Sequence, residues 1–162
     1  MVRNVEILDT TLRDGEQTSG MSFSSSEKLT IAKLLLEELK VDRIEIASAR
    51  VSDGEFIAVN NITNWAKENN YLSKVEVLTF LDNGASINWL NSSGARVQNL
   101  LTKGSLNHLK YQIKKTPNEH FKDVYNSVHD AKKLNIATNV YLEDWSNGMR
   151  NSQDYVFDYL DL

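Results

Sequence analysis

The sequence predicts an α/β fold in which short parallel strands alternate with helices. Three observations lead to this prediction: β-rich runs recur along the chain, helix-start signals lie between them, and polar residues follow each run. Alternation of strands and helices is the pattern of βα units, so we expect one parallel sheet. The expected strands are Val5–Leu8, Arg43–Ala47, Val75–Phe80, Val97–Leu101 and Ile136–Leu142.

Helix starts are marked by capping sequences in which a hydroxyl residue precedes a glutamate by three positions. These sequences are Ser24–Glu27, Ser52–Glu55 and Thr116–Glu119, the last with Pro117 at the first helical position. In Leu29–Leu39 apolar residues recur at helical spacing, which predicts one apolar face lying on the sheet. That face comprises Leu29, Ile31, Ala32, Leu35, Leu36 and Leu39.

The composition is that of one soluble domain, with 162 residues of which 41% are hydrophobic and 25% charged. A net charge of -4 gives no basic surface for nucleic acid or an anionic membrane, and the apolar runs are too short to span a bilayer. The absence of cysteine excludes disulfides, thiolate metal ligands and a cysteine nucleophile. Residues 1–4 leave no room for a signal peptide, so we expect a cytoplasmic protein.

The most informative stretch is Ile7–Gln17, where the first strand runs into a dense group of polar residues. Arg13 offers a planar fork of donors that suits a carboxylate or a keto-acid oxygen. Asp14 offers a hard anionic oxygen of the kind that binds Mg, Mn or Zn. An arginine beside such a carboxylate rarely serves packing, although a solvated loop with a local Arg–Asp pair would give the same short motif.

The full string L-D-T-T-L-R-D-G-E-Q, followed by Gly20, resembles the first strand of the acyl-CoA-dependent 2-isopropylmalate, homocitrate and citramalate synthases. The resemblance implies a (β/α)8 barrel, a divalent metal (Mg, Mn or Zn), acetyl-CoA as co-substrate, and a role as an acyltransferase in leucine or isoleucine biosynthesis. Distant lyases of the same group keep R-D-G but usually lose L-D-T-T-L and E-Q. The string therefore favours the synthases.

The resemblance also implies roles for single residues. Asp14 would bind the metal, Arg13 would be catalytic, and Glu45 of the second strand would lie at the substrate oxygens. Glu45 stands within an aliphatic run, where a carboxylate is costly unless paired, so we expect it to pair with Arg13. The alternative for Glu45 is a partly solvated charge near the bottom of the barrel. Gln17 is a further candidate substrate contact, because working residues of barrels follow the strands.

Two later strand ends supply further candidates. His108 stands in an S-x-x-H loop similar to that of the family and is a candidate contact for substrate or acyl-CoA, unless it is an ordinary solvated histidine. Glu143 belongs to an E-D pair that resembles the family's, and it is a candidate catalytic residue for proton transfer or for ordering a water. Its neighbour Asp144 can be a turn former alone, and Arg150 is left unassigned because its spacing differs from the family's.

Substrate choice should depend on three bulky residues expected to point inward near the strand ends: Leu78, Leu101 and Tyr141. They leave little room for an isopropyl group, and the sequence around them resembles citramalate synthases, which take pyruvate. The predicted reaction is condensation of acetyl-CoA with pyruvate and water to (R)-citramalate. The alternative activities are those of a 2-isopropylmalate synthase that uses 2-oxoisovalerate and of a lyase of the same group. The alternative role of the three bulky residues is ordinary packing in the layers of the barrel, where leucine is common.

The remaining histidines and glycines give no further site. None of His108, His120 and His129 forms an H-x-H pair, and the last two fall in the predicted fourth helix, far from strand ends. Because the family's metal site needs such a pair from a late strand, Asp14 is the one metal ligand expected in this chain. Gly15–Gly20 lacks the lysine and hydroxyl residue of a phosphate loop, which argues against nucleotide binding.

Five βα units are expected here, whereas a closed barrel needs eight and about 250 residues. We therefore expect residues 1–162 to be the N-terminal part of the catalytic barrel of a longer enzyme, which would be a homodimer, with any regulatory domain elsewhere. This part alone should be inactive, bind metal weakly and expose a sheet edge that promotes self-association. The alternatives are a complete small α/β domain with an open sheet, and a non-catalytic binding module.

Overall fold

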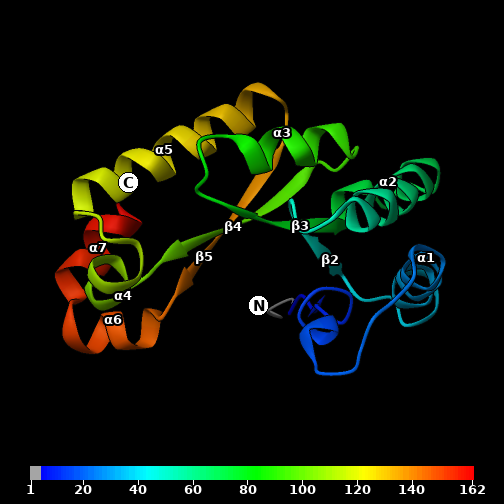
Figure 1. Ribbon diagram of the computed structural model, residues 1–162, viewed down its shortest axis with the longest axis horizontal. Coiled ribbons are helices and arrows are strands. Elements are labelled where there is room, and N and C mark those ends of the chain that lie inside the picture. The colour runs from blue at the N-terminus through cyan, green and yellow to red at the C-terminus, as the bar shows by residue number, and fades with distance from the viewer. Residues whose placement is uncertain (1–4) are drawn as a thin grey trace.

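The computed structural model describes residues 5–162, in which parallel strands follow one another around an arc in the order β1-β2-β3-β4-β5. Helices cover the outer side of this arc (Figure 1). The predicted barrel fold, with five βα units in this chain, is confirmed. Residues 1–4, on which the signal-peptide prediction depends, lie outside the described residues. The strands are β1 (Leu8–Asp9), β2 (Arg43–Ser48), β3 (Val75–Phe80), β4 (Val97–Lys103) and β5 (Ala137–Glu143).

The helices begin where the capping sequences predict. The side chains of Ser24, Ser52 and Thr116 each accept a hydrogen bond from the backbone N–H three residues later. The helices are α1 (Ser25–Lys33), α2 (Asp53–Glu68), α3 (Ala85–Ser92), α4 (Leu106–His108), α5 (Pro117–Lys133), α6 (Trp145–Asn151) and α7 (Gln153–Leu160). Short 3-10 or π-helical turns are η1 (Gly15–Gln17), η2 (Leu34–Glu38), η3 (Leu72–Lys74) and η4 (Leu109–Ile113).

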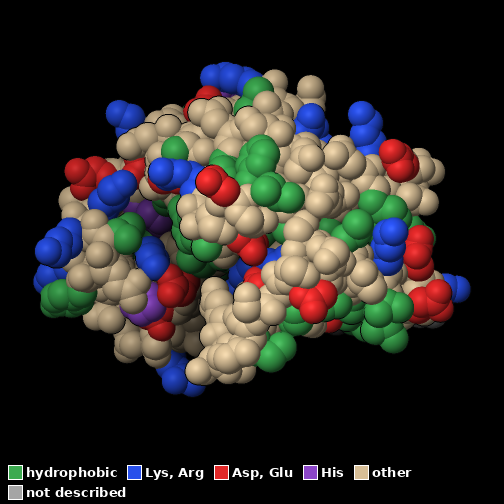
Figure 2. Space-filling view, turned by 45° about the vertical axis from the view of Figure 1, so that its right-hand side comes forward, with side chains coloured by type: hydrophobic (Ala, Val, Ile, Leu, Met, Phe, Trp, Pro, Cys, Tyr) green, Lys and Arg blue, Asp and Glu red, His purple; other side chains and the backbone are tan. Residues whose placement is uncertain are grey.

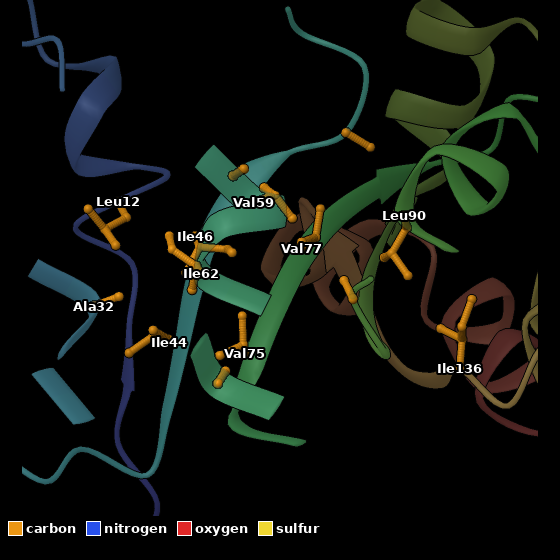
Figure 3. Close-up of a cluster of buried hydrophobic side chains, with 14 of the residues drawn as sticks. Leu12, Ala32, Ile44, Ile46, Val59, Ile62, Val75, Val77, Leu90 and Ile136 are labelled. Carbon is orange, nitrogen blue, oxygen red and sulfur yellow. The ribbon is translucent and has the colours of Figure 1, made fainter. Parts of the chain in front are cut away.

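The main hydrophobic core lies between the convex face of the sheet and helices α1, α2 and α3 (Figure 3). Ile44 and Ile46 of β2 and Val75 and Val77 of β3 are buried there. Successive side chains of a strand point to opposite faces, so Glu45 and Glu76, which lie between these pairs, must face the inside of the arc. A smaller cluster around Leu100 joins β4 to α5 and α7.

The concave face of the sheet carries buried polar side chains. Glu45 of β2 and Asn99 of β4 are separated by the whole of β3, yet Asn99 Nδ2 donates to Glu45 Oε1 at 2.7 Å. Two side chains meet across an intervening strand only when both project from the same side of a strongly curved sheet. This side is therefore the inside of the barrel arc.

Two local predictions are wrong. β1 begins at Leu8 rather than at Val5, because this edge strand pairs only with β2, from Leu8 opposite Arg43. Leu39, which was predicted to belong to the apolar face of the first helix, is 71% exposed and lies outside that face. The helix passes into the π turn η2, in which the Leu39 N–H donates to the Leu34 carbonyl. A π turn holds one more residue than an α turn and so rotates the residues that follow it.

Helices α4, α6 and α7 gather beyond the carboxyl ends of β4 and β5 (Figure 1). Helix α6 has no capping signal: it follows Asp144, whose backbone is left-handed at φ 64° and whose side chain makes no cap hydrogen bond. On the face shown in Figure 2, acidic and basic side chains intermingle. Within residues 5–162, every helix is too short or too polar to span a lipid bilayer.

Candidate active site

The loop after β1 forms a tight turn that presents Arg13 and Asp14. The Thr10 carbonyl accepts hydrogen bonds from the N–H groups of Arg13 and Asp14 at 3.1 and 2.8 Å. The Asp9 carboxylate accepts from the Thr11 N–H at 2.9 Å and from its hydroxyl at 3.2 Å. The polar residues at the start of the motif therefore shape the turn.

Arg13 lies between two carboxylates. Its Nε donates to Glu45 Oε2 at 2.5 Å, and its Nη1 donates to Asp14 Oδ1 at 2.6 Å. Glu45 is fully buried, so the expected Arg13–Glu45 pair is present and Glu45 is not a solvated charge. The Arg13 side chain is 15% exposed and that of Asp14 61% exposed, so both remain within reach of a ligand.

Asn99 connects this group to the later strands, and it was not among the predicted site residues. Besides its bond to Glu45, Asn99 Nδ2 donates to the Tyr141 hydroxyl at 2.9 Å. Asn139 Nδ2 donates to Asn99 Oδ1 at 3.0 Å. The signal that could have revealed this network is an asparagine at the middle of each of two adjacent strands, where an unpaired amide would be costly.

Three predicted substrate contacts surround Asn99. Leu78 stands opposite Asn99 in the pairing of β3 with β4, and Leu101 stands opposite Tyr141 in the pairing of β4 with β5. The hydrogen bond from Asn99 fixes the Tyr141 ring on the concave face. Burial and the nearby Glu45 carboxylate raise the pKa of Tyr141 to about 12, which keeps its hydroxyl neutral.

Glu143 at the end of β5 forms an ion pair with Lys103, which stands opposite it at the end of β4. Lys103 was missed in the sequence because a lysine after a strand is common on any surface. The Gly104 N–H donates to the Glu143 carbonyl at 2.7 Å, and a Cβ on Gly148 would overlap the Gly104 carbonyl oxygen. This close packing fixes the two strand ends side by side. The Glu143 side chain is 40% exposed and open to a ligand.

His108 lies beside Asp144. Its Nε2 is 3.5 Å from Asp144 Oδ2, and the Ser105 hydroxyl donates to the same oxygen at 2.6 Å. The bond from Ser105, with smaller contributions from Asn147 and His108, lowers the pKa of Asp144 below its usual range. Asp144 therefore joins the loops that follow β4 and β5, which is more than a turn former does.

Gln17 is exposed at the end of η1 and borders a hollow of about 300 Å³. The hollow lies between the loops that follow β1 and β2, and Arg13 and Glu16 also line it. Gln17 thus shares a cavity with Arg13, on the side away from the later strands.

Asp14 suits a hard cation, because its exposed carboxylate has an oxygen beyond the one bonded to Arg13. Among residues 5–162, however, no three His, Cys, Asp or Glu side chains are grouped closely enough to hold a metal ion. A metal site of three or more such ligands that included Asp14 would therefore need groups from outside these residues.

The prediction that His120 lies far from the strand ends is wrong. His120 is fully buried, and its Nε2 accepts a hydrogen bond from the Lys103 N–H at 3.4 Å. Its Nδ1 lies 3.0 Å from the Tyr155 hydroxyl, which itself donates to the Lys103 carbonyl at 2.7 Å. Helices α5 and α7 thus hold the end of β4. Burial lowers the pKa of His120 to about 4.

A family model described as HMGL-like matches residues 4–156 of this sequence. The chain belongs to the HMGL-like family. It is 33% identical over 156 residues to the 2-isopropylmalate synthase of Saccharolobus solfataricus, a match that covers 96% of this chain and 38% of that protein. It is 36% identical over 144 residues to the 2-isopropylmalate synthase of Pyrococcus furiosus, a match that covers 89% of this chain and 28% of that protein. This HMGL-like chain therefore spans less than half the length of these relatives.

Two solved structures share the fold of this HMGL-like chain. The HMG-CoA lyase of Bacillus subtilis has a TM-score of 0.63 at 20% identity and covers 96% of this chain and 55% of its own. The hydroxymethylglutaryl-CoA lyase of Pseudomonas aeruginosa has a TM-score of 0.57 at 14% identity, and the match covers 85% of this chain and 45% of the lyase. At these identities the likeness supports the fold alone.

We expect Arg13→Met to lower the free energy of unfolding by about 3 kcal/mol, because removing one partner leaves a charge buried without compensation. Here that charge is the Glu45 carboxylate. Urea unfolding measures the loss, and Arg13→Met combined with Glu45→Gln should recover part of it. The matched control is Arg50→Met, since the Arg50 side chain is 52% exposed and its pair with Asp82 should contribute under ~1 kcal/mol. Equal losses in the two single variants would contradict this account.

We also expect stability to fall between about pH 6.5 and pH 4 because of His120. The unfolded histidine takes up a proton near pH 6.5, whereas the folded one resists protonation until its pKa of about 4. Below pH 6.5 the unfolded state therefore binds more protons and is favoured. Thermal or urea unfolding across this pH range should show a shallower decline for His120→Gln than for the wild type. The exposed His129, changed to Gln, should leave the decline as it is.

Proposed function

We propose that this HMGL-like chain contributes the first five βα units of an acyl-CoA-dependent enzyme that condenses a 2-oxo acid. In this reaction acetyl-CoA, a 2-oxo acid and water give a 2-alkylmalate and CoA. The observation that carries the proposal is the Arg13 guanidinium, held by buried Glu45 beside an exposed Asp14. The 2-isopropylmalate synthases that match over most of this chain support condensation rather than cleavage.

In the proposed reaction, Arg13 donates to the keto oxygen of the 2-oxo acid and stabilises the alkoxide as charge develops. Because Glu45 and Asp14 orient the guanidinium before substrate binds, little reorganisation is needed during the reaction. Asp14 would provide one oxygen ligand to a divalent metal ion (Mg, Mn or Zn), which when bound supplies Lewis-acid polarisation of the keto oxygen. Gln17 and His108 would contact the bound substrates.

Glu143 would take the methyl proton of acetyl-CoA or orient the water that cleaves the thioester. Its carboxylate is partly exposed at the end of β5, and the ion pair with Lys103 limits the directions in which it points. Loss of this proton turns the methyl carbon into the nucleophile, which attacks the keto carbon and forms the new carbon–carbon bond. Water then adds to the thioester carbonyl and CoA leaves as a thiol. We assign this chemistry to a cytoplasmic homodimer when the enzyme is full length.

The proposed 2-oxo acid is pyruvate, which would make (R)-citramalate the product. Leu78, Leu101 and Tyr141 are neighbours of Asn99 in the strand pairing, on the face that Glu45 shares, and they would restrict the space for a branched side chain. The second candidate is 2-oxoisovalerate, the acid from which 2-isopropylmalate is made, and the names of the relatives favour it.

In the full-length protein, Asp14→Asn should abolish metal-dependent turnover of acetyl-CoA with the 2-oxo acid, because the neutral amide is a poorer ligand for a hard cation. Release of CoA thiol measures the rate, with and without added divalent metal. Asp130→Asn changes an exposed acid that pairs with Lys133 and should leave the rate unchanged. Wild-type turnover in Asp14→Asn would remove the assignment of Asp14.

Comparison of kcat/KM for pyruvate and for 2-oxoisovalerate decides the substrate. We expect pyruvate to be preferred. Leu101→Ala should raise kcat/KM for 2-oxoisovalerate relative to that for pyruvate by about tenfold, the effect typical of adding space for a methyl group or two. Leu39→Ala, at an exposed position, is the control. A wild-type enzyme that prefers 2-oxoisovalerate would overturn pyruvate in favour of the second candidate.

A further inference from the structure

Lys28 on α1 is a charged residue inside the molecule, with 1% of its side chain exposed. Its Nζ forms ion pairs with Glu16 Oε2 at 2.5 Å and with Glu55 Oε1 at 2.6 Å. The same nitrogen donates to the Leu12 carbonyl at 3.2 Å and lies 3.5 Å from the Ile46 carbonyl. A buried ammonium is costly unless its charge and its donors are matched, and here acceptors surround it.

The two carbonyl groups link Lys28 to the proposed site. The Leu12 carbonyl belongs to the peptide bond that leads into Arg13, and Ile46 directly follows Glu45. The ammonium therefore lies against the backbone of the turn after β1 and of β2, at the residues next to Arg13 and Glu45. Helix α1 fixes its position, because Lys28 follows the capped start of that helix at Ser24.

The two carboxylates extend this connection to the loops. Glu16 Oε1 accepts a hydrogen bond from the Phe23 N–H at 2.9 Å, so Glu16 closes the loop from η1 to the start of α1. Glu55 lies in the first turn of α2, whose cap is Ser52. Both glutamates line the 300 Å³ hollow that Arg13 and Gln17 share. Glu16 is the glutamate of the E-Q that follows R-D-G, and its partner is Lys28 rather than a ligand.

We propose that Lys28 is a positioning residue that holds the turn after β1 against β2 so that the Arg13 guanidinium meets Glu45 before substrate binds. It acts through Glu16 and the Leu12 carbonyl, without touching the 2-oxo acid. Its effect on turnover rests on the proposed function, whereas its effect on the Arg13–Glu45 contact does not. Lys28 also gives a physical reason for the glutamate after R-D-G, which must reach a cation on the next helix.

The first test observes the Arg13–Glu45 contact directly in the full-length protein. A nitrogen–proton NMR spectrum should show the Arg13 Nε–H, assigned by its absence in Arg13→Lys, as a signal protected from exchange with water by its bond to buried Glu45. In Lys28→Met this protection should fall by at least about tenfold. Lys33→Met, on the same helix but outside this cluster, should keep it. A folded Lys28→Met protein with unchanged protection would overturn the proposal.

Lys28→Met leaves two carboxylates facing each other and can fail to fold. In that case Glu16→Gln carries the same test, because it keeps the Lys28 charge and its bond to Glu55. Its Arg13 signal should lose protection, and limited proteolysis should cut the loop between residues 16 and 23 faster than in the wild type. Glu16→Gln with wild-type protection and wild-type proteolysis would overturn the proposal.

Turnover separates this proposal from the proposed function. With acetyl-CoA and pyruvate, Lys28→Met or Glu16→Gln should lower kcat/KM by up to about 100-fold, the effect of a small misplacement of a catalytic group. A merely structural role would lower the urea midpoint and leave kcat/KM of the folded enzyme unchanged, which would also overturn the proposal. A wild-type enzyme without turnover of any 2-oxo acid would refute the proposed function alone, since the NMR and proteolysis measurements do not require it.

Discussion

The buried carboxylate of Glu45 is the group on which the concave face of this sheet depends. A carboxylate in a dry interior must have both oxygens satisfied, and here Arg13 takes one and Asn99 takes the other. Arg13 comes from the turn after β1 and Asn99 from β4, so a single charge on β2 connects the turn after the first strand to the fourth strand. The Arg13 guanidinium, which would bind a ligand, is therefore held in place by its ion pair with the buried Glu45 carboxylate.

The two faces of the sheet make different kinds of contact. On the convex face, isoleucine and valine of β2 and β3 hold the helices through apolar contact, which tolerates small shifts. On the concave face the contacts are hydrogen bonds and ion pairs with narrow geometric requirements. Polar side chains on the helices also bond to the backbone of the strands and of the turns that follow them: Lys28 bonds to Leu12, and His120 and Tyr155 bond to Lys103.

Sequence patterns were sufficient for the parts of the molecule governed by local rules. Strands β2 and β3 and the capped helix starts were predicted because aliphatic runs and hydroxyl–glutamate caps act over a few residues. The Arg13–Glu45 pair was predicted because a charge in an aliphatic strand demands a partner. Residues such as Asn99, Lys28 and His120 could not be assigned in this way. Their partners in these hydrogen bonds lie 16 to 54 positions away, and only the assembled sheet brings them together.

The contact between Gly104 and Gly148 has a consequence for the dimensions of this side of the barrel. The carbonyl of Gly104 occupies the volume where any larger residue at position 148 would place its first carbon. Helix α6 can approach the ends of β4 and β5 only because that carbon is missing. The separation between α6 and the end of β4 is therefore set by one absent side chain, and an added methyl group at position 148 would push the helix away from Gly104.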